Sequence, residues 1–173
     1  MNEYVFDPDN LGSFKGISQS LKRIFDTPYP VILCVGSDLA VGDSLGPYIG
    51  SLLQRRLNNN LYIYGTLNSP ITAKEVDAVF NNIKVIHPKS KILVIDASVG
   101  NKEDIGLIKI SDKGIKPGLG VNKNLRELGD VSIIGIVAEK NSSLNKILYS
   151  TRFSLVYKLS EVIVLGILDY LNY

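Results

Sequence analysis

The stretch that decides the fold runs Val31-Ile-Leu-Cys-Val-Gly-Ser-Asp-Leu-Ala-Val-Gly-Asp-Ser-Leu-Gly-Pro47. Its first five residues are apolar, as in a strand that is buried on both faces, and a loop with two glycines and two carboxylates follows. A helix then begins near Ser44, and Pro47 fits its first turn, where a backbone N–H has no intrahelical acceptor. This order is typical of α/β proteins, in which ligands bind beyond the carboxyl ends of the strands.

A second apolar run, Lys91-Ile-Leu-Val-Ile-Asp96, also ends on an acidic residue. If the two strands lie parallel in one sheet, Asp43 and Asp96 meet at the same sheet edge. Two neighbouring carboxylates share one proton, so one can activate water while the other donates a proton. The pattern therefore predicts hydrolysis at an aspartate pair. The alternative is that Asp43 or Ser44 caps the helix and Asp96 accepts hydrogen bonds from loop amides.

Helical and strand patterns alternate along the rest of the chain. We expect helices from Leu11, Ser44 and Thr72 and at the C-terminal end, and strands near residues 30–35, 61–64, 91–96, 105–110 and 131–137. The turn-rich segment after Gly100 lets the strand at 105–110 run antiparallel to its predecessor. The expectation is one α/β domain over residues 1–173, with three α/β/α layers and a central mixed, mostly parallel sheet.

Composition excludes several classes of function. The 19 basic and 17 acidic side chains are scattered and give a net charge of +2, so we expect no nucleic-acid partner and no anionic membrane surface. Cys34 is the single cysteine and lies in an apolar strand, which fits a core residue in a reducing compartment. The N-terminus lacks a signal-peptide pattern, and the longest apolar run, at 162–168, is far below the ~20 residues that span a bilayer. We expect a cytoplasmic protein.

The C-terminal segment predicts a helix that is apolar on most sides. Phe153, Val156, Leu159, Ile163 and Ile167 follow one another at three- and four-residue intervals, and residues 162–168 are apolar nearly all round. Either the rest of the domain or a second subunit covers such a surface. A homo-oligomer formed through this helix is therefore a prediction that the sequence leaves open.

Three motifs together resemble a known family: Asp43-Ser-Leu-Gly-Pro47 after a strand and a glycine, Ile95-Asp-Ala97, and Lys116-Pro-Gly-Leu-Gly-Val121. In this order they are similar to the spore germination protease and to its shorter relative, the sporulation protein YyaC group. The length and the C-terminal end resemble the YyaC group more closely. A more distant resemblance links the chain to the fold of the hydrogenase maturation proteases. The resemblance implies a phosphorylase/hydrolase-like α/β/α fold.

The resemblance also implies an activity. It carries the acid-type catalytic pair of the germination protease over to Asp43 and Asp96, with a protein or peptide as substrate. The small acid-soluble spore proteins are the implied substrates, and the cytoplasm of the developing spore is the implied location. The chain departs from the germination protease where that enzyme has an asparagine shortly after the strand glycine, since here the residues are Gly36-Ser-Asp38. The departure leaves activity on those substrates open.

Two loops supply candidate substrate-binding residues. Gly36, Ser37 and Asp38 belong to the first acidic loop, where we expect Asp38 to act mainly as a turn former. The second loop contributes Lys116, Pro117, Gly118 and Gly120. Its glycines let backbone amides approach a peptide carbonyl or a developing oxyanion. The alternative for the second loop is a tight structural turn.

We expect no metal and no other cofactor. In the hydrogenase maturation proteases a later histidine joins the carboxylates at a metal, but the single histidine here, His87, precedes the strand at 91–96. We expect His87 at the end of a helix, where the helix dipole suits it. Ser37 has no candidate histidine partner, which argues against a Ser-His-Asp hydrolase.

Two rival functions use the same carboxylates. A non-catalytic protein of this fold would use them to hold a cation or a basic side chain of a partner. A receiver-like domain would accept a phosphoryl group on Asp96. The receiver is the weaker rival, because the loop-rich segment at 111–130 does not fit a simple alternation of strands and helices.

Overall fold

The computed structural model describes residues 2–25, 29–57, 61–116, 127–140, 148 and 150–173. Its strands, in chain order, are β1 (Glu3–Phe6), β2 (Val31–Cys34), β3 (Ile63–Tyr64), β4 (Ile92–Gly100), β5 (Ile108–Ser111) and β6 (Val131–Glu139). Its α-helices are α1 (Ser13–Ile24), α2 (Leu45–Leu57), α3 (Val76–Ile86) and α5 (Phe153–Leu171). Two short 3₁₀ helices are η1 (Val41–Ser44) and η2 (Lys102–Asp104).

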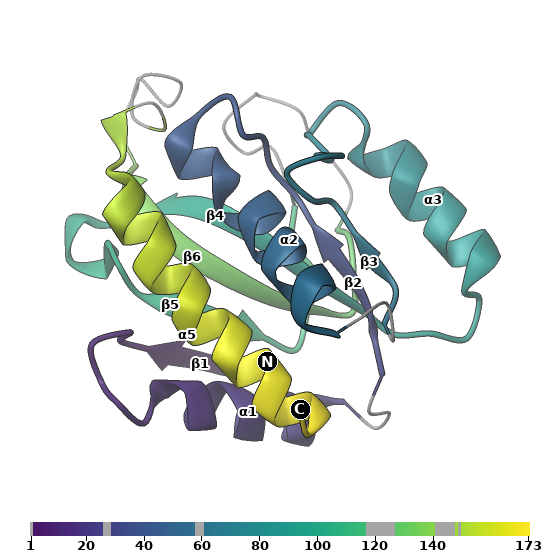
Figure 1. The fold of residues 1–173 in the computed structure, drawn as a ribbon, viewed down its shortest axis with the longest axis horizontal. Helices are drawn as coiled ribbons and strands as arrows, with labels where there is room; N and C mark the ends of the chain where they lie inside the picture. Colours follow the sequence, from purple (N-terminus) through teal and green to yellow (C-terminus); the bar gives the residue numbers. More distant parts are fainter. Residues whose placement is uncertain (1, 26–28, 58–60, 117–126, 141–147, 149) are drawn as a thin grey trace.

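The strands form one sheet in the order β1-β5-β6-β4-β2-β3 (Figure 1). β3, β2, β4 and β6 are parallel neighbours, whereas β5 runs antiparallel to both β6 and β1. β2 and β4 are interior strands of this order, and β2 and the first half of β4 are buried throughout, which explains their uninterrupted apolar sequence. The predicted α/β class with a mixed, mostly parallel sheet is confirmed.

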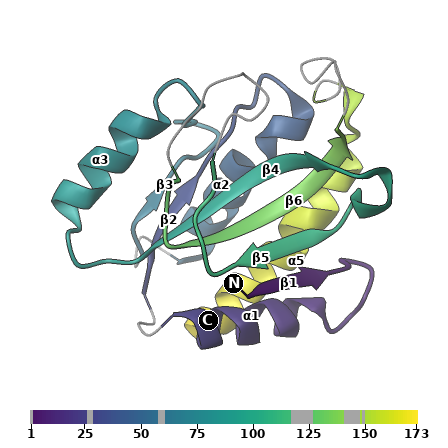
Figure 2. The same ribbon diagram turned by 180° about the vertical axis from the view of Figure 1, so that it is seen from behind.

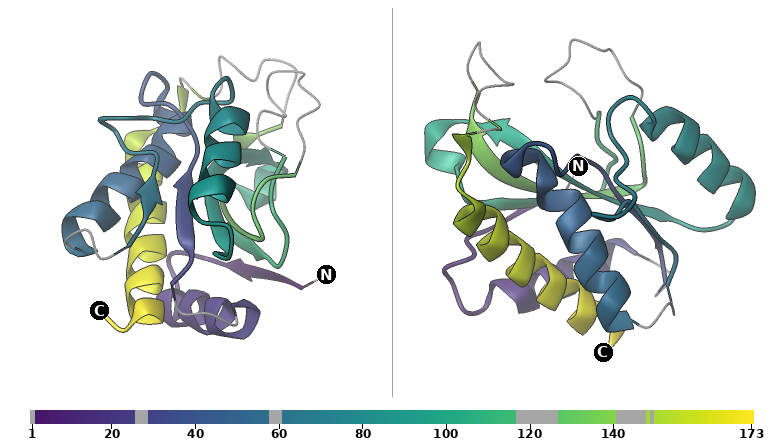
Figure 3. Two further views of the ribbon diagram at one scale, coloured as in Figure 1. Left: turned by 90° about the vertical axis from the view of Figure 1, so that its right-hand side faces the viewer. Right: turned by 45° about the horizontal axis from the view of Figure 1, so that its top comes forward.

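Helices cover both faces of the sheet (Figures 2 and 3). Alternate strand residues point to opposite faces, so Ile32 of β2 belongs to one apolar core and its neighbour Leu33 to the other. The first core also contains Ile49 of α2 and Ile163 of α5, and helix α1 packs there as well. The second core contains Phe80 of α3. The structure therefore has the three α/β/α layers that the alternating pattern predicts.

Strand β1 is absent from the sequence-based expectation. It pairs antiparallel with β5 at the edge of the sheet, with Tyr4 opposite Ile110. Its four residues alternate between exposed and half-buried positions, a signal too short to separate from a loop. β5 has the expected direction but begins three residues later and neighbours β6, so β6 lies between it and β4.

Two helix starts also differ from the expectation. Leu11 is 94% exposed, and α1 begins only at Ser13. Thr72 and Glu75 form the expected capping box, since the Glu75 carboxylate accepts the Thr72 N–H at 3.1 Å, and the regular helix begins at Val76. Such shifts are common because the first turn of a helix is irregular.

The sheet order argues against the receiver-like alternative. A receiver has five parallel strands in the order 2-1-3-4-5, whereas this sheet ends in the antiparallel strand β5 and in β1.

Among the described residues, no helix combines the length and the apolar character needed to cross a bilayer.

Helix α2 meets the end of β3 backbone to backbone. A Cβ atom built on Gly50 would lie 2.0 Å from the carbonyl oxygen of Gly65 and 3.2 Å from Sγ of Cys34, which is fully buried. No side chain fits between these elements. Gly50 therefore sets the distance at which α2 lies over the sheet.

We expect Gly50→Ala to destabilise the fold. Alanine favours a helix over glycine by roughly 1 kcal/mol, but the backbone contact makes the extra methyl group an overpacking defect that costs about 1–3 kcal/mol or more. Urea unfolding monitored by circular dichroism measures the net loss. Gly12→Ala is the matched control, because a Cβ there meets no atom closer than 3.4 Å. Equal stability of the two variants would contradict this account of the contact.

Candidate active site

The loop after β2 folds back on itself beside the strand end. The N–H of Ser37 donates to the carbonyl of Asp43 at 3.1 Å, and the N–H of Gly36 donates to the carbonyl of Ile71 at 2.9 Å. Gly36 has φ +135°, and a Cβ on it would lie 2.1 Å from the Asp43 carbonyl oxygen. Only glycine adopts this conformation without strain, so Gly36 fixes the position of Asp43. Its contact with a substrate stays a prediction.

The first turn of α2 lies directly over the ends of β2 and β4. A Cβ on Gly46 would lie 2.1 Å from the carbonyl oxygen of Val35 and 3.0 Å from that of Ile95. Asp43 stands three residues earlier, in η1, and is half-buried. Because the helix backbone lies this close to the strand ends, η1 and Asp43 lie near Asp96 of β4.

Asp96 occupies a strand position rather than a loop. It pairs with Ile134 in the β4–β6 ladder and is half-buried, at the point where the buried half of β4 gives way to its more exposed half. Its carboxylate accepts the N–H of Ala97 at 2.8 Å. Its neighbour Ile95 pairs with Cys34, the last residue of β2, so Asp96 lies level with the carboxyl end of β2. Ligands of open α/β sheets bind beyond such strand ends.

The two carboxyls interact electrostatically. Burial, and after it the negative charge of Asp43, raise the pKa of Asp96 well above its ordinary value of 3.8, while the Ala97 N–H opposes the shift. Burial also raises the pKa of Asp43, and a backbone hydrogen bond from Ser37 opposes that shift. The arrangement favours one ionised and one protonated carboxyl, which together titrate as a pair.

Cys34 lies close to this pair but remains a neutral thiol. It is fully buried, and burial, followed by the charge of Asp96, raises the pKa of its thiol far above the ordinary range. A thiol in such surroundings is not a nucleophile. This agrees with its expected place in the core.

The helix-capping alternative for Asp43 and Ser44 stays a prediction. The Ser44 hydroxyl donates to the carbonyl of Val41 at 2.7 Å and does not accept a helix N–H in that bond. At the start of η1, which Ala40 precedes, no described side chain makes a capping hydrogen bond, and capping of α2 by Asp43 or Ser44 is a separate contact. The Asp96 carboxylate does accept the N–H of Ala97, but Ala97 belongs to strand β4 rather than to a loop, so a hydrogen bond from loop amides stays a prediction.

Ser37 and Asp38 have different positions in the first loop. The hydroxyl of Ser37, which is half-buried, accepts the N–H of Leu39 at 3.2 Å and so forms the turn. Asp38 is exposed, and Leu39 beside it is 78% exposed. Ser37, rather than Asp38, is thus the turn former of this loop. Their contact with a substrate stays a prediction.

The second loop is described only at its base. Lys116 is exposed, whereas Pro117, Gly118 and Gly120 lie outside the described residues. Ile115 and Leu128 form an antiparallel bridge with backbone hydrogen bonds of 2.9 and 2.8 Å. The bridge brings the two ends of the loop together. Binding of a substrate by the loop stays a prediction.

His87 lies at the C-terminal end of α3, as the sequence predicts. Its Nε2 atom is 2.9 Å from the hydroxyl of Tyr64, and its ring centroid is 4.2 Å from that of Tyr62. These contacts tie α3 to β3 at the amino edge of the sheet, away from Asp96. Within the described part of the chain, no three His, Cys, Asp or Glu side chains gather where they could hold a metal ion.

Sequence reasoning missed the segment that supports the first loop from outside. The carbonyl of Ile71 accepts the N–H of Gly36. Before it, residues 66–69 form a tight turn through two hydrogen bonds of 3.1 Å between Thr66 and Ser69. The Asn68-Ser-Pro70 sequence is a turn signal, but nothing in it indicates a contact with residue 36. The contact depends on the parallel pairing of β2 with β3, which a single sequence does not reveal.

Comparison with known proteins identifies the relatives of the chain. Residues 8–166 match the family described as "Protein of unknown function (DUF1256)". The chain is 34% identical over 151 residues to "Uncharacterized protein YyaC" of Bacillus subtilis (strain 168), a match that covers 87% of this chain and 73% of that protein. Among solved structures it is similar to the [NiFe] hydrogenase maturation protease HycI from Thermococcus kodakarensis KOD1, with 17% identity, a TM-score of 0.44, and coverage of 83% of this chain and 98% of that one.

The first two of these matches extend over most of the chain, and they confirm the resemblance to the YyaC group. The chain therefore belongs to the DUF1256 family and is a relative of YyaC.

Proposed function

We propose that the protein is an aspartate-dependent peptidase in which Asp43 and Asp96 hydrolyse a peptide bond. The observation that carries the proposal is the electrostatic coupling of two half-buried carboxyls at the carboxyl edge of the sheet. One carboxyl that keeps its proton beside one that loses it is what acid-base hydrolysis of an amide requires.

The two carboxyls take different roles because their surroundings differ. The negative charge of Asp43 is one cause of the raised pKa of Asp96, so we assign Asp43 as the carboxyl that ionises first. It removes a proton from water as the water oxygen bonds to the peptide carbonyl carbon. Asp96 holds its proton to higher pH and donates it to the amide nitrogen as the carbon–nitrogen bond breaks. Asp43 is then protonated and Asp96 ionised, and transfer of this proton through water restores the starting state.

The identity of the substrate rests on the family resemblance. The spore germination protease acts on small acid-soluble spore proteins, and we extend this substrate class, together with a role in sporulation and a location in the developing spore, to this chain as part of the proposal. Cleavage of such a protein by the purified chain is the direct test of this extension.

We expect Asp43→Asn and Asp96→Asn each to lower cleavage of an unfolded protein by about 10²-fold or more, because each removes a general acid or base. Reduced, carboxymethylated α-lactalbumin is a suitable substrate, and mass spectrometry of the products measures the rate. Asp169→Asn is the matched control, since Asp169 lies on α5 and its carboxylate forms a 4.0 Å ion pair with Lys22, a partly exposed contact on the helix surface.

Circular dichroism establishes that the variants fold. Full cleavage activity in both Asn variants would contradict the proposal. Binding of peptides or divalent cations without cleavage by the unmodified chain would favour the non-catalytic alternative instead.

The pH dependence of cleavage follows from the two pKa shifts. Both pKa values are raised above 3.8, that of Asp96 the more, so we expect kcat/KM to rise with pH as Asp43 ionises and to fall as Asp96 loses its proton. The profile is bell-shaped, with its acidic limb above the pKa of an ordinary aspartate, about 3.9. A rate that only increases toward alkaline pH would contradict the assigned roles.

The raised pKa of Asp96 also makes stability depend on pH. Below the pKa of the unfolded chain, about 3.9, the carboxyl is protonated in both states, so the folded state buries no charge. As pH rises through the folded-state pKa, the folded protein loses a proton that it binds more tightly than the unfolded chain, and stability falls.

We therefore expect Asp96→Asn to gain stability relative to the unmodified chain as pH rises above about 4, because asparagine carries no charge. Urea unfolding of both proteins between pH 4 and pH 8 measures the difference, which isolates the contribution of the one carboxyl. A stability difference that is constant across this range would argue that Asp96 is not perturbed.

A further inference from the structure

The carboxyl half of β4 lacks a neighbouring strand on the β2 side. β2 pairs with β4 only as far as Ile95, whose carbonyl accepts the N–H of Val35 at 2.8 Å. β4 continues beside β6 from Asp96 to Gly100, and these residues are half-buried (Figure 2). In the described part of the chain, no strand pairs with them on their other side. The sheet therefore has an open side that begins at Asp96.

Backbone groups of two β4 residues point to this open side. The carbonyl of Gly100 accepts the N–H of Lys140, which follows β6, whereas the carbonyl of Ile95 faces β2. Backbone groups alternate in direction along a strand, so those of Ala97 and Val99 face away from β6. Among the described residues, neither the carbonyl of Ala97 nor the N–H of Val99 makes a backbone hydrogen bond on that side.

The aspartate pair lies on the same side of β4. The Asp96 carboxylate accepts the N–H of Ala97 at 2.8 Å, so it is turned to the open side and occupies the first donor there. The helix η1, which carries Asp43, contacts β4. The N–H of Val99 is the next donor along the strand, about 6.7 Å from that of Ala97, and this distance is also the two-residue repeat of an extended chain. An extended polypeptide can therefore bond to Val99 while a peptide unit two residues away lies at Asp96.

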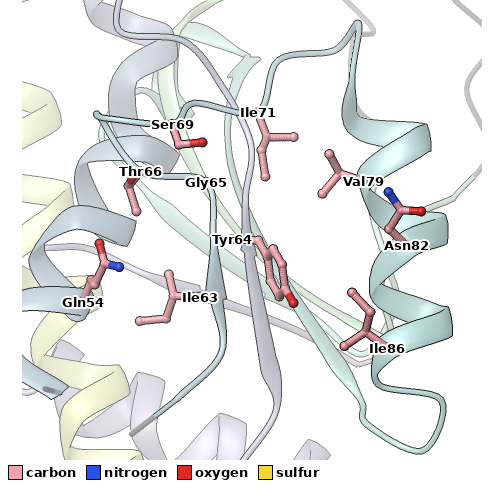
Figure 4. A pocket seen from close by; sticks show the side chains of 10 residues that line it. All are labelled: Gln54, Ile63, Tyr64, Gly65, Thr66, Ser69, Ile71, Val79, Asn82 and Ile86. Carbon is pink, nitrogen blue, oxygen red and sulfur yellow. The ribbon is translucent and has the colours of Figure 1, made fainter. Parts of the chain in front are cut away.

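The pocket beside β3 does not include the aspartate pair. Its volume is about 420 Å³, and residues such as Tyr64, Val79 and Asn82 line it, but neither Asp43 nor Asp96 does (Figure 4). A peptide bond in that pocket would not contact the proposed acid and base. The open side of β4 differs because Asp96 itself belongs to it.

We infer that the N–H of Val99, with the neighbouring carbonyl of Ala97, binds the main chain of the substrate and holds its scissile peptide bond at Asp96. This inference rests on the proposed peptidase function and names its substrate class: extended polypeptide segments whose N–H and C=O groups are free. Main-chain hydrogen bonds give affinity without selecting a side chain. A helical or paired segment does not bind, because its own secondary structure uses the same groups.

Val99→Pro tests the donor directly. Proline has no N–H, and the backbone groups of residue 99 face away from β6, so the substitution removes the open-side donor and keeps the pairing of β4 with β6. We expect kcat/KM for cleavage of reduced, carboxymethylated α-lactalbumin to fall about tenfold or more, because a substrate hydrogen bond is lost. Val99→Ala is the matched control, since it keeps the N–H, and its kcat/KM should stay within about twofold of that of the unmodified chain.

Amide exchange provides a second readout that does not depend on the folding of a Val99 variant. Hydrogen–deuterium exchange measured by NMR follows the Val99 amide in the full-length chain with Asp43→Asn, which leaves the probe intact. We expect reduced, carboxymethylated α-lactalbumin to slow exchange at Val99 by about tenfold or more, and native α-lactalbumin to leave it unchanged. The Lys140 amide is the internal control, because it already donates to the Gly100 carbonyl at 2.7 Å.

The outcomes separate this inference from the proposed peptidase function. Unchanged exchange at Val99 in the presence of the unfolded probe would overturn the inference, and so would equal kcat/KM values of folded Val99→Pro and Val99→Ala chains. Cleavage by the unmodified chain would still support the aspartate pair in both cases. Slower exchange at Val99 without cleavage by the unmodified chain would support main-chain binding and overturn the peptidase. Neither slower exchange nor cleavage would overturn both.

Discussion

The contact between helix α2 and the ends of the central strands is the constraint on which the rest of the site depends. Gly46 lets the helix backbone touch the carbonyl oxygens of Val35 and Ile95, and η1 precedes that turn without a break. Asp43 therefore has little freedom to move relative to Asp96. The coupling between the carboxyls is thus a property of backbone packing rather than of a flexible pair of side chains.

The same packing sets a conflict between stability and chemistry. An ionised carboxyl that is half-buried beside another carboxyl is unfavourable in the folded state, and the raised pKa of Asp96 has this cause. The surrounding apolar cores, with β2 and β4 buried between helices on both faces, stabilise the fold enough to hold the pair. Strain of this kind is common where a fold carries a reactive site.

Much of the fold was accessible from the sequence. The apolar runs at β2 and β4 and the helical spacing in α5 identify the layers, because burial on both faces or along a stripe leaves a strong pattern. The carboxylates stand out because Asp43 belongs to the loop after one buried apolar run and Asp96 ends another. Three features could not be predicted: strand β1, the position of β6 between β4 and β5, and the hydrogen bond from the Gly36 N–H to the Ile71 carbonyl. Each of these depends on pairing between distant segments, which leaves no local period in the chain.

The glycines that permit close backbone contact have a consequence for genetics. At Gly36, Gly46 and Gly50 an added methyl group would lie within about 2 Å of a backbone oxygen. Substitutions there abolish function by destabilising the fold, although glycine has no side chain that could take part in the reaction. A survey of inactivating mutations would therefore find them at these glycines as often as at Asp43 and Asp96. Only the abundance of folded protein in each mutant would separate the two groups.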